Sequence, residues 1–240
     1  MKRILLVVAA LFLMTATANA ATIMLEDFED AAVSYTTQVP EFTDGSGDFF
    51  TRTDGSNIGS YVSYNNIQGS GYFAVMDTNG DGGPTPVTMT FSNIDINGYS
   101  NLAFSGLFAE DDASDGKEDW DRVDYVTIEY RIDNGSYQNL LAFENDGETY
   151  NTQAYQDTDF DGNGDGAALT DTFALFGADI AGTGSSLDLQ LTFRLEAGDE
   201  DIALDNLMVT GTAAPVPVPS AFILLGAGVV AVCGLRRRNS

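Results

Sequence analysis

Short runs in which apolar and polar residues alternate dominate the chain between residues 21 and 211. Residues 187–195 alternate without a break and carry Leu or Phe at every second position. Side chains of a strand point to its two faces in turn, so this run predicts a strand with one buried face. We expect further strands at residues 72–76, 87–91, 102–108, 126–132, 173–176 and 202–209.

A tight turn is predicted directly after the strand at 126–132. Asn134 and Gly135 follow it, and both residue types tolerate the positive φ angles of a two-residue type I′ turn. This turn would pair Val126 with Phe143, Ile128 with Leu141, and Ile132 with Tyr137. The apolar residues of the hairpin would then share one face.

Residues 21–211 contain no sustained stripe of helical periodicity. Many strands joined by turns rich in Gly, Asp, Asn and Ser are typical of two sheets packed face to face. We therefore predict an all-β fold, an antiparallel β-sandwich of the jelly-roll type, as a single domain over 21–211.

The first 20 residues are typical of a secretory signal peptide. Lys2 and Arg3 precede an apolar stretch at 4–14, and the small residues Ala18 and Ala20 follow it. We expect cleavage after Ala20 and folding outside the cytoplasm.

The last residues combine a proline motif, an apolar stretch and a basic end. Residues 212–219 predict a linker that holds the motif, and 220–240 an apolar helix that ends in an arginine cluster. At ~1.5 Å per residue, the apolar residues 221–235 span only ~22 Å, less than the ~30 Å hydrocarbon core of a membrane. Arginines after such a stretch resist crossing. The residues that define the motif and the cluster are Val216, Pro217, Pro219, Arg236, Arg237 and Arg238.

This tail resembles the PEP-CTERM sorting tail, which exosortase-type enzymes of Gram-negative bacteria process. The resemblance implies a transient anchor in the inner membrane, an exosortase-type partner, and delivery to the cell envelope or the medium. The family has Glu between the two prolines, where this chain has Val218. Which processing enzyme matches this variant therefore stays open, and the alternative is a permanent C-terminal anchor.

Charge and composition limit the chemistry of the domain. All 36 Asp and Glu lie within 21–211, whereas half of the 10 Lys and Arg lie in the terminal segments. Such a negative domain repels nucleic acid. The chain has no His and its one Cys, Cys233, lies in the tail, so triads, thiol nucleophiles and disulfides are excluded from the domain.

Three short motifs carry a second resemblance. They are LEDFED at 25–30, GYFAVMD at 71–77 and IALDN at 202–206. Together they resemble the MAM domain and its concanavalin-like jelly-roll relatives, although this chain lacks the disulfide cysteines of a true MAM domain. The resemblance implies a noncatalytic adhesion or recognition module, with Glu29 and Asp205 as ligands of a structural Ca²⁺. The alternative is that Asp205 lies at a bulge and faces solvent.

A second calcium site is predicted between residues 157 and 165. The alternating oxygen ligands are Asp157, Asp159, Asp161, Asn163 and Asp165. Glycines between them permit the sharp turn that a calcium loop requires. The acid expected at the twelfth position of an EF-hand loop is missing in every register, so a solvated acidic turn is the alternative.

Trp120 is the only Trp and closes an acidic loop at 110–120. We expect its ring either to stack on a sugar or to cover an edge of the core. No feature singles out a catalytic pair of carboxylates, and no phosphate-binding glycine loop is present.

The sequence thus predicts an exported, noncatalytic, calcium-stabilised β-sandwich. We expect it at the cell surface or in the extracellular matrix, in association with polysaccharide or surface proteins. A lectin-like carbohydrate-binding module is the first alternative, and a glycoside-cleaving enzyme the second.

Overall fold

The structure is a computed structural model that describes residues 20–80, 83–111 and 120–214. The chain divides into two compact units, of which Ala20–Ala213 holds all of the described strands. The predicted signal peptide, apart from its last residue, and the sorting motif with its arginine cluster lie outside the described residues. In the part that is described, no helix has the length and hydrophobicity needed to cross a membrane.

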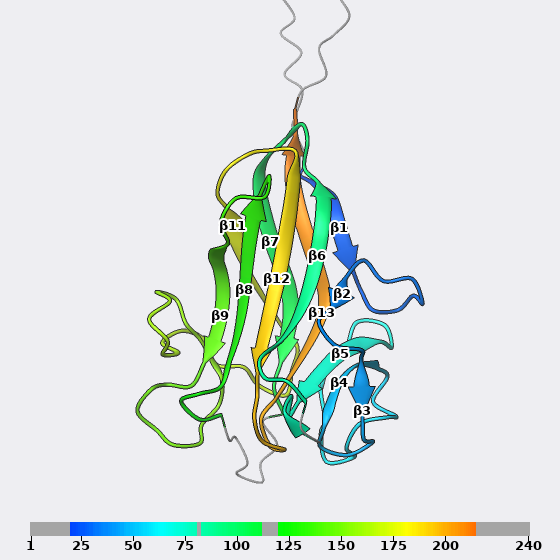
Figure 1. The fold of residues 1–240 in the computed structure, drawn as a ribbon, viewed down its shortest axis with the longest axis vertical. Coiled ribbons are helices and arrows are strands. Elements are labelled where there is room, and N and C mark those ends of the chain that lie inside the picture. Colours follow the sequence, from blue (N-terminus) through cyan, green and yellow to red (C-terminus); the bar gives the residue numbers. More distant parts are fainter. Residues whose placement is uncertain (1–19, 81–82, 112–119, 215–240) are drawn as a thin grey trace, which may run out of the picture. The chain divides into compact units, whose positions relative to one another are not determined.

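Two antiparallel sheets make up the domain (Figure 1). The seven-stranded sheet contains β11 (Ala174–Ile180), β7 (Tyr99–Ala109), β13 (Asp201–Ala213), β5 (Tyr72–Met76), β4 (Phe49–Thr53) and β3 (Phe42–Thr43) in this order, and β1 (Ala20–Glu26) pairs with β13. The six-stranded sheet contains β10 (Tyr155–Gln156), β9 (Gln138–Glu144), β8 (Tyr125–Ile132), β12 (Ser186–Arg194), β6 (Val87–Asp95) and β2 (Thr36–Thr37).

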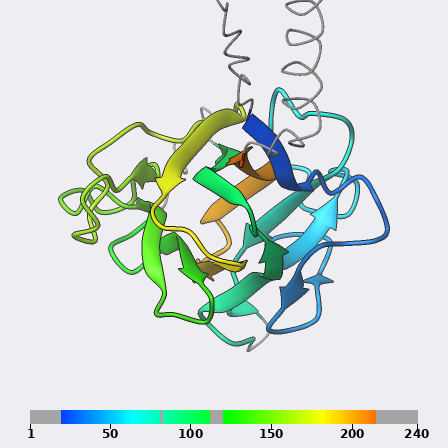
Figure 2. The same ribbon diagram turned by 90° about the horizontal axis from the view of Figure 1, so that it is seen from above.

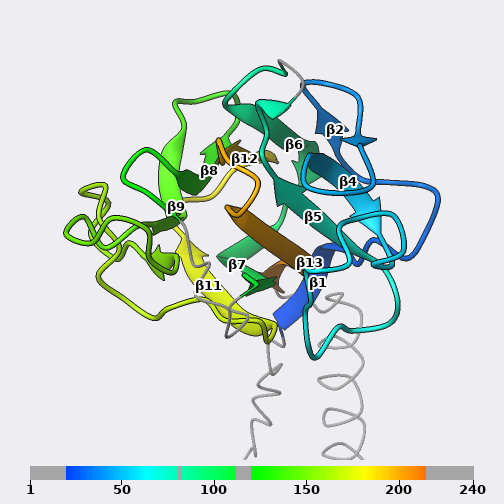
Figure 3. The same cartoon turned by 90° about the horizontal axis from the view of Figure 1, so that it is seen from below.

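The sheets face each other as two layers, which Figure 2 and Figure 3 show from the two ends. The strands of seven or more residues run β1-β13-β7-β11 in one sheet and β6-β12-β8-β9 in the other. Consecutive strands such as β6 and β7, or β12 and β13, thus lie in different sheets. This is the crossing pattern of a jelly roll, and the predicted β-sandwich is confirmed.

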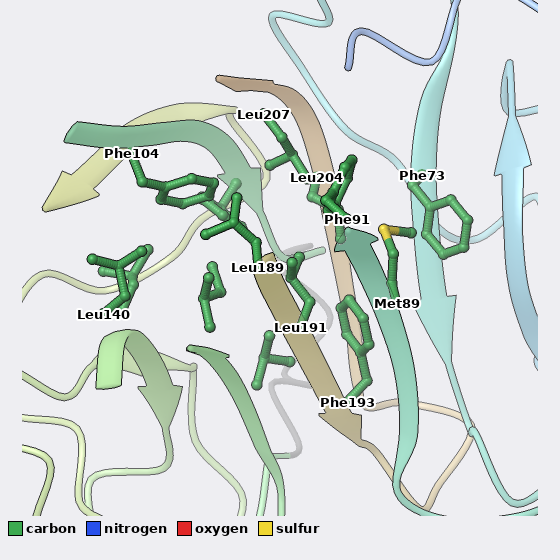
Figure 4. Close-up of a cluster of buried hydrophobic side chains, with 14 of the residues drawn as sticks. Phe73, Met89, Phe91, Phe104, Leu140, Leu189, Leu191, Phe193, Leu204 and Leu207 are labelled. Carbon is green, nitrogen blue, oxygen red and sulfur yellow. The ribbon is translucent and has the colours of Figure 1, made fainter. Parts of the chain in front are cut away.

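The core lies between the layers and is built by alternation. In β12, Leu187, Leu189, Leu191 and Phe193 are all fully buried, as the pattern at 187–195 predicts. Figure 4 shows Leu189 and Leu191 in a cluster of buried side chains that also contains Leu204 and Leu207 of β13. At roughly 25 cal/mol per Å² of buried apolar surface, contacts of this kind supply the main stabilisation of the fold.

A second apolar cluster covers the outer face of β5. All five residues of this strand are buried. Phe73 and Val75 belong to the core between the sheets, whereas Tyr72 and Met76 belong to a cluster with Ile58 and others from the loop that precedes β5. This double burial explains why β5 is a continuous apolar run and not an alternating one.

The β8–β9 hairpin confirms the predicted pairing in part. Val126 faces Phe143 and Ile128 faces Leu141, as expected. The turn itself lies one residue earlier than predicted: Asp133 and Asn134 have the positive φ angles, and Gly135 N–H donates to the carbonyl of Ile132 at 2.9 Å.

A bulge in β9 compensates for the shifted turn. The register changes between Ile128 and Glu129, so that Tyr130 faces Gln138. The predicted pair of Ile132 with Tyr137 is therefore wrong. Leu140 is the extra residue, and its side chain is buried beside Leu141. A bulge accommodates one additional residue on one strand.

The two end strands of the domain pair with each other. Ala20 faces Thr212 and Glu26 faces Leu207, in antiparallel register. β13 continues through Ala213, two residues beyond the predicted domain boundary at 211.

Candidate functional site

Three carboxylates of the predicted calcium loop converge. The loop follows β10, and one oxygen each from Asp157, Asp159 and Asp161 lies within 4.8 Å of the others. Asp157 is buried and organises the turn, because its Oδ1 accepts the N–H of Phe160 at 2.7 Å and its Oδ2 accepts that of Gly162 at 2.9 Å. The repulsion between neighbouring carboxylates, above all from Asp161, raises the pKa of Asp159.

Gly162 lies at the position where the EF-hand loop has its glycine. With Asp157 as the first position, Gly162 is the sixth, where the EF-hand loop needs a glycine for its sharp turn. Its φ of +89° is in the region that favours glycine. The donor set of hard oxygens and the turn both fit Ca²⁺.

Asn163 and Asp165 have a different part in the loop. The Asn163 side chain donates to Asp161 Oδ1 at 2.8 Å and lies against Gly147. Asp165 Oδ1 accepts hydrogen bonds from the N–H of Thr158 at 2.9 Å and from its hydroxyl, which lower the pKa of Asp165. These two predicted ligands brace the loop and do not join the converging group.

A hollow of about 270 Å³ opens beside this loop on β8 and β9. We call it the Phe160 hollow; its lining includes Thr127, Asn139, Ala142, Glu144, Asp157, Phe160, Asp161 and Gly162. Phe160 is 40% exposed, which is uncommon for this residue type. Burial and the nearby charge of Asp157 raise the pKa of Glu144 to about 7.

Glu29 and Asp205 bind one and the same loop. Glu29 Oε1 accepts the N–H of Ser70 at 2.6 Å and of Gly71 at 2.7 Å, and these bonds lower the pKa of Glu29. Asp205 Oδ2 accepts the N–H of Gln68 at 3.2 Å. The structure thus brings both predicted ligands to the segment 68–71, and the calcium ion expected between them stays a prediction.

Asp205 is fully buried, and the four residues before it on β13 are buried as well. A register shift begins at this residue, and Asn206 has a positive φ of 49°. The bulge foreseen in the alternative is therefore present, yet the carboxylate does not face solvent. Burial raises the pKa of Asp205 to about 6, against the hydrogen bonds from Asn206 and Gln68.

Trp120 does not lie where it could stack on a sugar, which is one of the two roles expected for it. The residue is fully buried in the core cluster, and its Nε1–H donates to the carbonyl of Asp201 at 3.1 Å. An enclosed indole has no free face for a ligand. The large apolar area of Trp makes such burial favourable when its N–H finds an acceptor, as it does here.

The structure contains a second group of converging acids that was not predicted from the sequence. Asp121, Asp124 and Glu200 each offer a carboxylate oxygen within 4.8 Å of the others. Asp124 and Glu200 are buried, and burial is the main cause that raises the pKa of each. Only the fold brings residues 121 and 200 together, so no local spacing in the sequence could have revealed this group.

Comparisons with known proteins give no family. No protein-family model matches the sequence, and no curated protein matches it. The chain is similar in structure to a CBM22-1 xylan-binding domain from Paenibacillus barcinonensis Xyn10C, with 16% identity, a TM-score of 0.43, and coverage of 83% of this chain and 100% of that one.

Two further structural likenesses are of the same degree. The K3 cleaved adhesin domain of Lys-gingipain from Porphyromonas gingivalis W83 has 16% identity and a TM-score of 0.44, over 80% of this chain and 99% of that one. The Stig cyclase Fisc from Fischerella sp. TAU has 13% identity and a TM-score of 0.45, over 82% of this chain and 100% of that one. These TM-scores lie below 0.5, and we infer no shared function from them.

Proposed function

We propose that the domain is a noncatalytic, calcium-stabilised recognition module that binds polysaccharide outside the cytoplasm. Calcium would bind at Asp157, Asp159 and Asp161, and a sugar would bind in the Phe160 hollow. The observation that carries the proposal is that one short loop holds both the converging carboxylates and the exposed ring.

The chemistry of the hollow suits a carbohydrate. The exposed ring of Phe160 offers an apolar face, while Asn139 and Glu144 in the same lining offer hydrogen-bond donors and acceptors. Ligand sites commonly combine an apolar surface with a few polar groups that fix orientation. A bound calcium ion would hold Phe160 in place, since the ring lies between two of the calcium ligands in the sequence.

The same residues argue against hydrolysis. A glycoside-cleaving enzyme needs two carboxyl groups that flank the scissile bond and act on it. Glu144 has the raised pKa that a general acid requires. Its acidic neighbour Asp157, however, already accepts three backbone N–H groups of its own loop. Asp157 thus serves the fold of the loop, and we assign Glu144 to binding.

The proposed location rests on the two terminal segments of the sequence. The signal peptide would direct export, and the PEP-CTERM-like tail would hold the protein in the inner membrane until an exosortase-type enzyme processes it. A fractionation experiment with a mass measurement tests this: we expect an exported chain that begins at Ala21 and is shortened near Pro217 and Pro219. A full-length chain in the cytoplasmic fraction would contradict the proposal.

Retention of the purified chain on the host's own extracellular polysaccharide tests the binding function. We expect retention in Ca²⁺, weaker retention in chelator, and loss of retention in Phe160→Ala. Tyr150→Ala is the matched control, because Tyr150 is an aromatic residue that is 78% exposed and does not line the hollow.

Other results of the retention assay would indicate a different function of the domain. Equal retention of both variants would place sugar binding elsewhere on the domain. A chain that is stabilised by Ca²⁺ but binds no polysaccharide would be a structural or protein-adhesion module. Release of shortened glycans during the assay would favour an enzyme.

A further inference from the structure

The group of Asp121, Asp124 and Glu200 joins two segments that are far apart in sequence. Asp121 and Asp124 precede β8, and Glu200 ends the turn between β12 and β13, at the lower end of the sandwich in Figure 1. Their converging oxygens lie within 4.8 Å of one another. The group is distinct from the Phe160 hollow, whose lining contains none of these three residues.

The backbone fixes the orientation of each carboxylate through one of its oxygens. Asp124 Oδ2 accepts the N–H of Asp121 at 2.6 Å, and Asp121 Oδ1 accepts the N–H of Val123 at 2.8 Å. Glu200 Oε2 accepts the N–H of Ala197 at 2.8 Å. Each residue is thereby anchored on one side and keeps a second oxygen for another partner.

Asp124 Oδ1 is the observation that points to a ligand. This atom is buried and has no hydrogen-bond donor among the described residues, and the whole side chain is inaccessible to solvent. The charged group that affects Asp124 most is another carboxylate, that of Glu200, which lies within hydrogen-bonding reach of the Asp124 carboxyl group. A buried carboxylate oxygen without a donor is costly unless a cation or a proton compensates it.

No described arginine forms an ion pair or a hydrogen bond with Asp124. Arg194 lies within electrostatic range of Asp124, but its ion pair is with Glu196 at 3.1 Å. Arg122 donates to the carbonyl of Glu148. The other described arginines, Arg52 and Arg131, pair with Glu41 and Asp188.

We propose that Asp121, Asp124 and Glu200 bind a divalent cation of the calcium class. The three donors are hard oxygens, and the chain has no His and no Cys outside its tail, which disfavours zinc or copper. Ca²⁺ takes six to eight oxygen ligands, so waters or carbonyls complete the shell. The ion fastens the segment before β8 to the β12–β13 turn.

Trp120 provides a direct readout of this site. It is the only Trp of the chain and is adjacent to Asp121. Tb³⁺ occupies calcium sites, and its luminescence is sensitised by an aromatic ring close to the ion. We expect light absorbed by Trp, and not by Tyr, to excite Tb³⁺ bound to the purified chain, and Ca²⁺ to displace it.

Two matched variants assign the signal to one site. Trp-sensitised emission should persist in Asp159→Asn/Asp161→Asn, which removes ligands of the proposed calcium loop, and should be lost in Glu200→Gln. Asp121→Asn provides a second test at a partly exposed ligand, in case the buried substitution unfolds the chain. In that variant we expect at least a tenfold weaker Tb³⁺ affinity, with an unchanged near-ultraviolet circular dichroism spectrum.

Two results would overturn the proposal. The first is a folded parent chain that shows no Trp-sensitised emission. The second is emission that is lost in the Asp159/Asp161 variant and unchanged in the folded Asp121→Asn variant. Either would leave Asp124 and Glu200 to share a proton in place of a cation. The first result leaves calcium binding at the 157–165 loop open, whereas the second would assign the bound ion to that loop, and neither bears on binding in the Phe160 hollow.

Discussion

The Tyr64 hydroxyl donates a hydrogen bond to Asp201 Oδ1, although the two residues are 137 positions apart in the sequence. Asp201 also accepts the N–H of Asp111 at 3.1 Å. Both bonds lower the pKa of Asp201, but burial outweighs them and raises it to about 7. The first residue of β13 is therefore an acid whose charged form is disfavoured in the folded state.

This relationship predicts that stability falls as the pH rises from about 4 to about 7. A carboxyl group with a raised folded-state pKa stabilises the fold fully below its unfolded pKa of about 3.9, and this contribution is lost as the pH reaches the folded-state value. The expected slope is at most about 1.4 kcal/mol per pH unit for one such group. Urea unfolding in chelator at several pH values measures it.

Asp201→Asn is the matched variant for this pH dependence. An amide keeps an oxygen that can accept from Tyr64 but does not titrate, so the slope should become shallower. Asp30→Asn, at an exposed position, should keep the slope of the parent. An unchanged slope in Asp201→Asn would show that Asp201 does not titrate in this range.

Asp205→Asn separates the cost of a buried acid at this position from a role of Asp205 in calcium binding. Without a bound ion, the substitution removes a buried acid whose pKa is raised to about 6, which favours the variant at pH 8. The amide nitrogen, however, cannot accept one of the two N–H groups that the carboxylate accepts from Asn206 and Gln68, so the thermal midpoint in chelator should change little. If Asp205 also binds Ca²⁺, the variant should lose part of the stabilisation that Ca²⁺ gives to the parent. We expect both results, and an undiminished calcium effect would remove Asp205 from the ligands.

Leu189→Ala should destabilise the domain by about 2–5 kcal/mol in urea unfolding. Leu189 is fully buried in β12, and truncation leaves a cavity between the sheets. Leu175→Ala is the control with the same chemical change, because Leu175 is 71% exposed on β11. Equal losses in the two variants would contradict the position of the core.

Trp120→Phe should lower stability without affecting retention on polysaccharide. The substitution leaves the carbonyl of Asp201 without its indole donor, which costs about 1–3 kcal/mol for a buried group, and reduces packing. The Phe160 hollow does not include this residue. Loss of retention in a folded Trp120→Phe chain would restore Trp120 as a ligand contact.

The strands were predictable because each depends on its own pattern. The run at 72–76 matches β5 at both ends, and the alternation at 187–195 predicts β12 with its buried face. The hairpin register failed only beyond Ile128, where the turn could form at two neighbouring positions. Asp133 can adopt a positive φ as readily as Asn134, and a bulge absorbs the difference.

The sites were less predictable because they depend on distant contacts. Local spacing was sufficient to predict that Asp157, Asp159 and Asp161 lie close together, because they are on one tight loop. It could not place Glu144 beside them, since β9 brings this residue to the hollow. It also could not distinguish a buried Trp120 from an exposed one, because the acceptor of its N–H lies on β13.

The pairing of β13 with three other strands has a mechanical consequence. The chain leaves the domain after Ala213, and β13 is hydrogen-bonded to β1, β7 and β5 along its length. Tension applied at this point runs along the strand and loads many backbone hydrogen bonds in shear, so they must break together. A domain held by its C-terminal end would resist drag through a strand that pairs with three others, whereas a pull on the two-residue edge strands β2 or β3 would separate them one bond at a time.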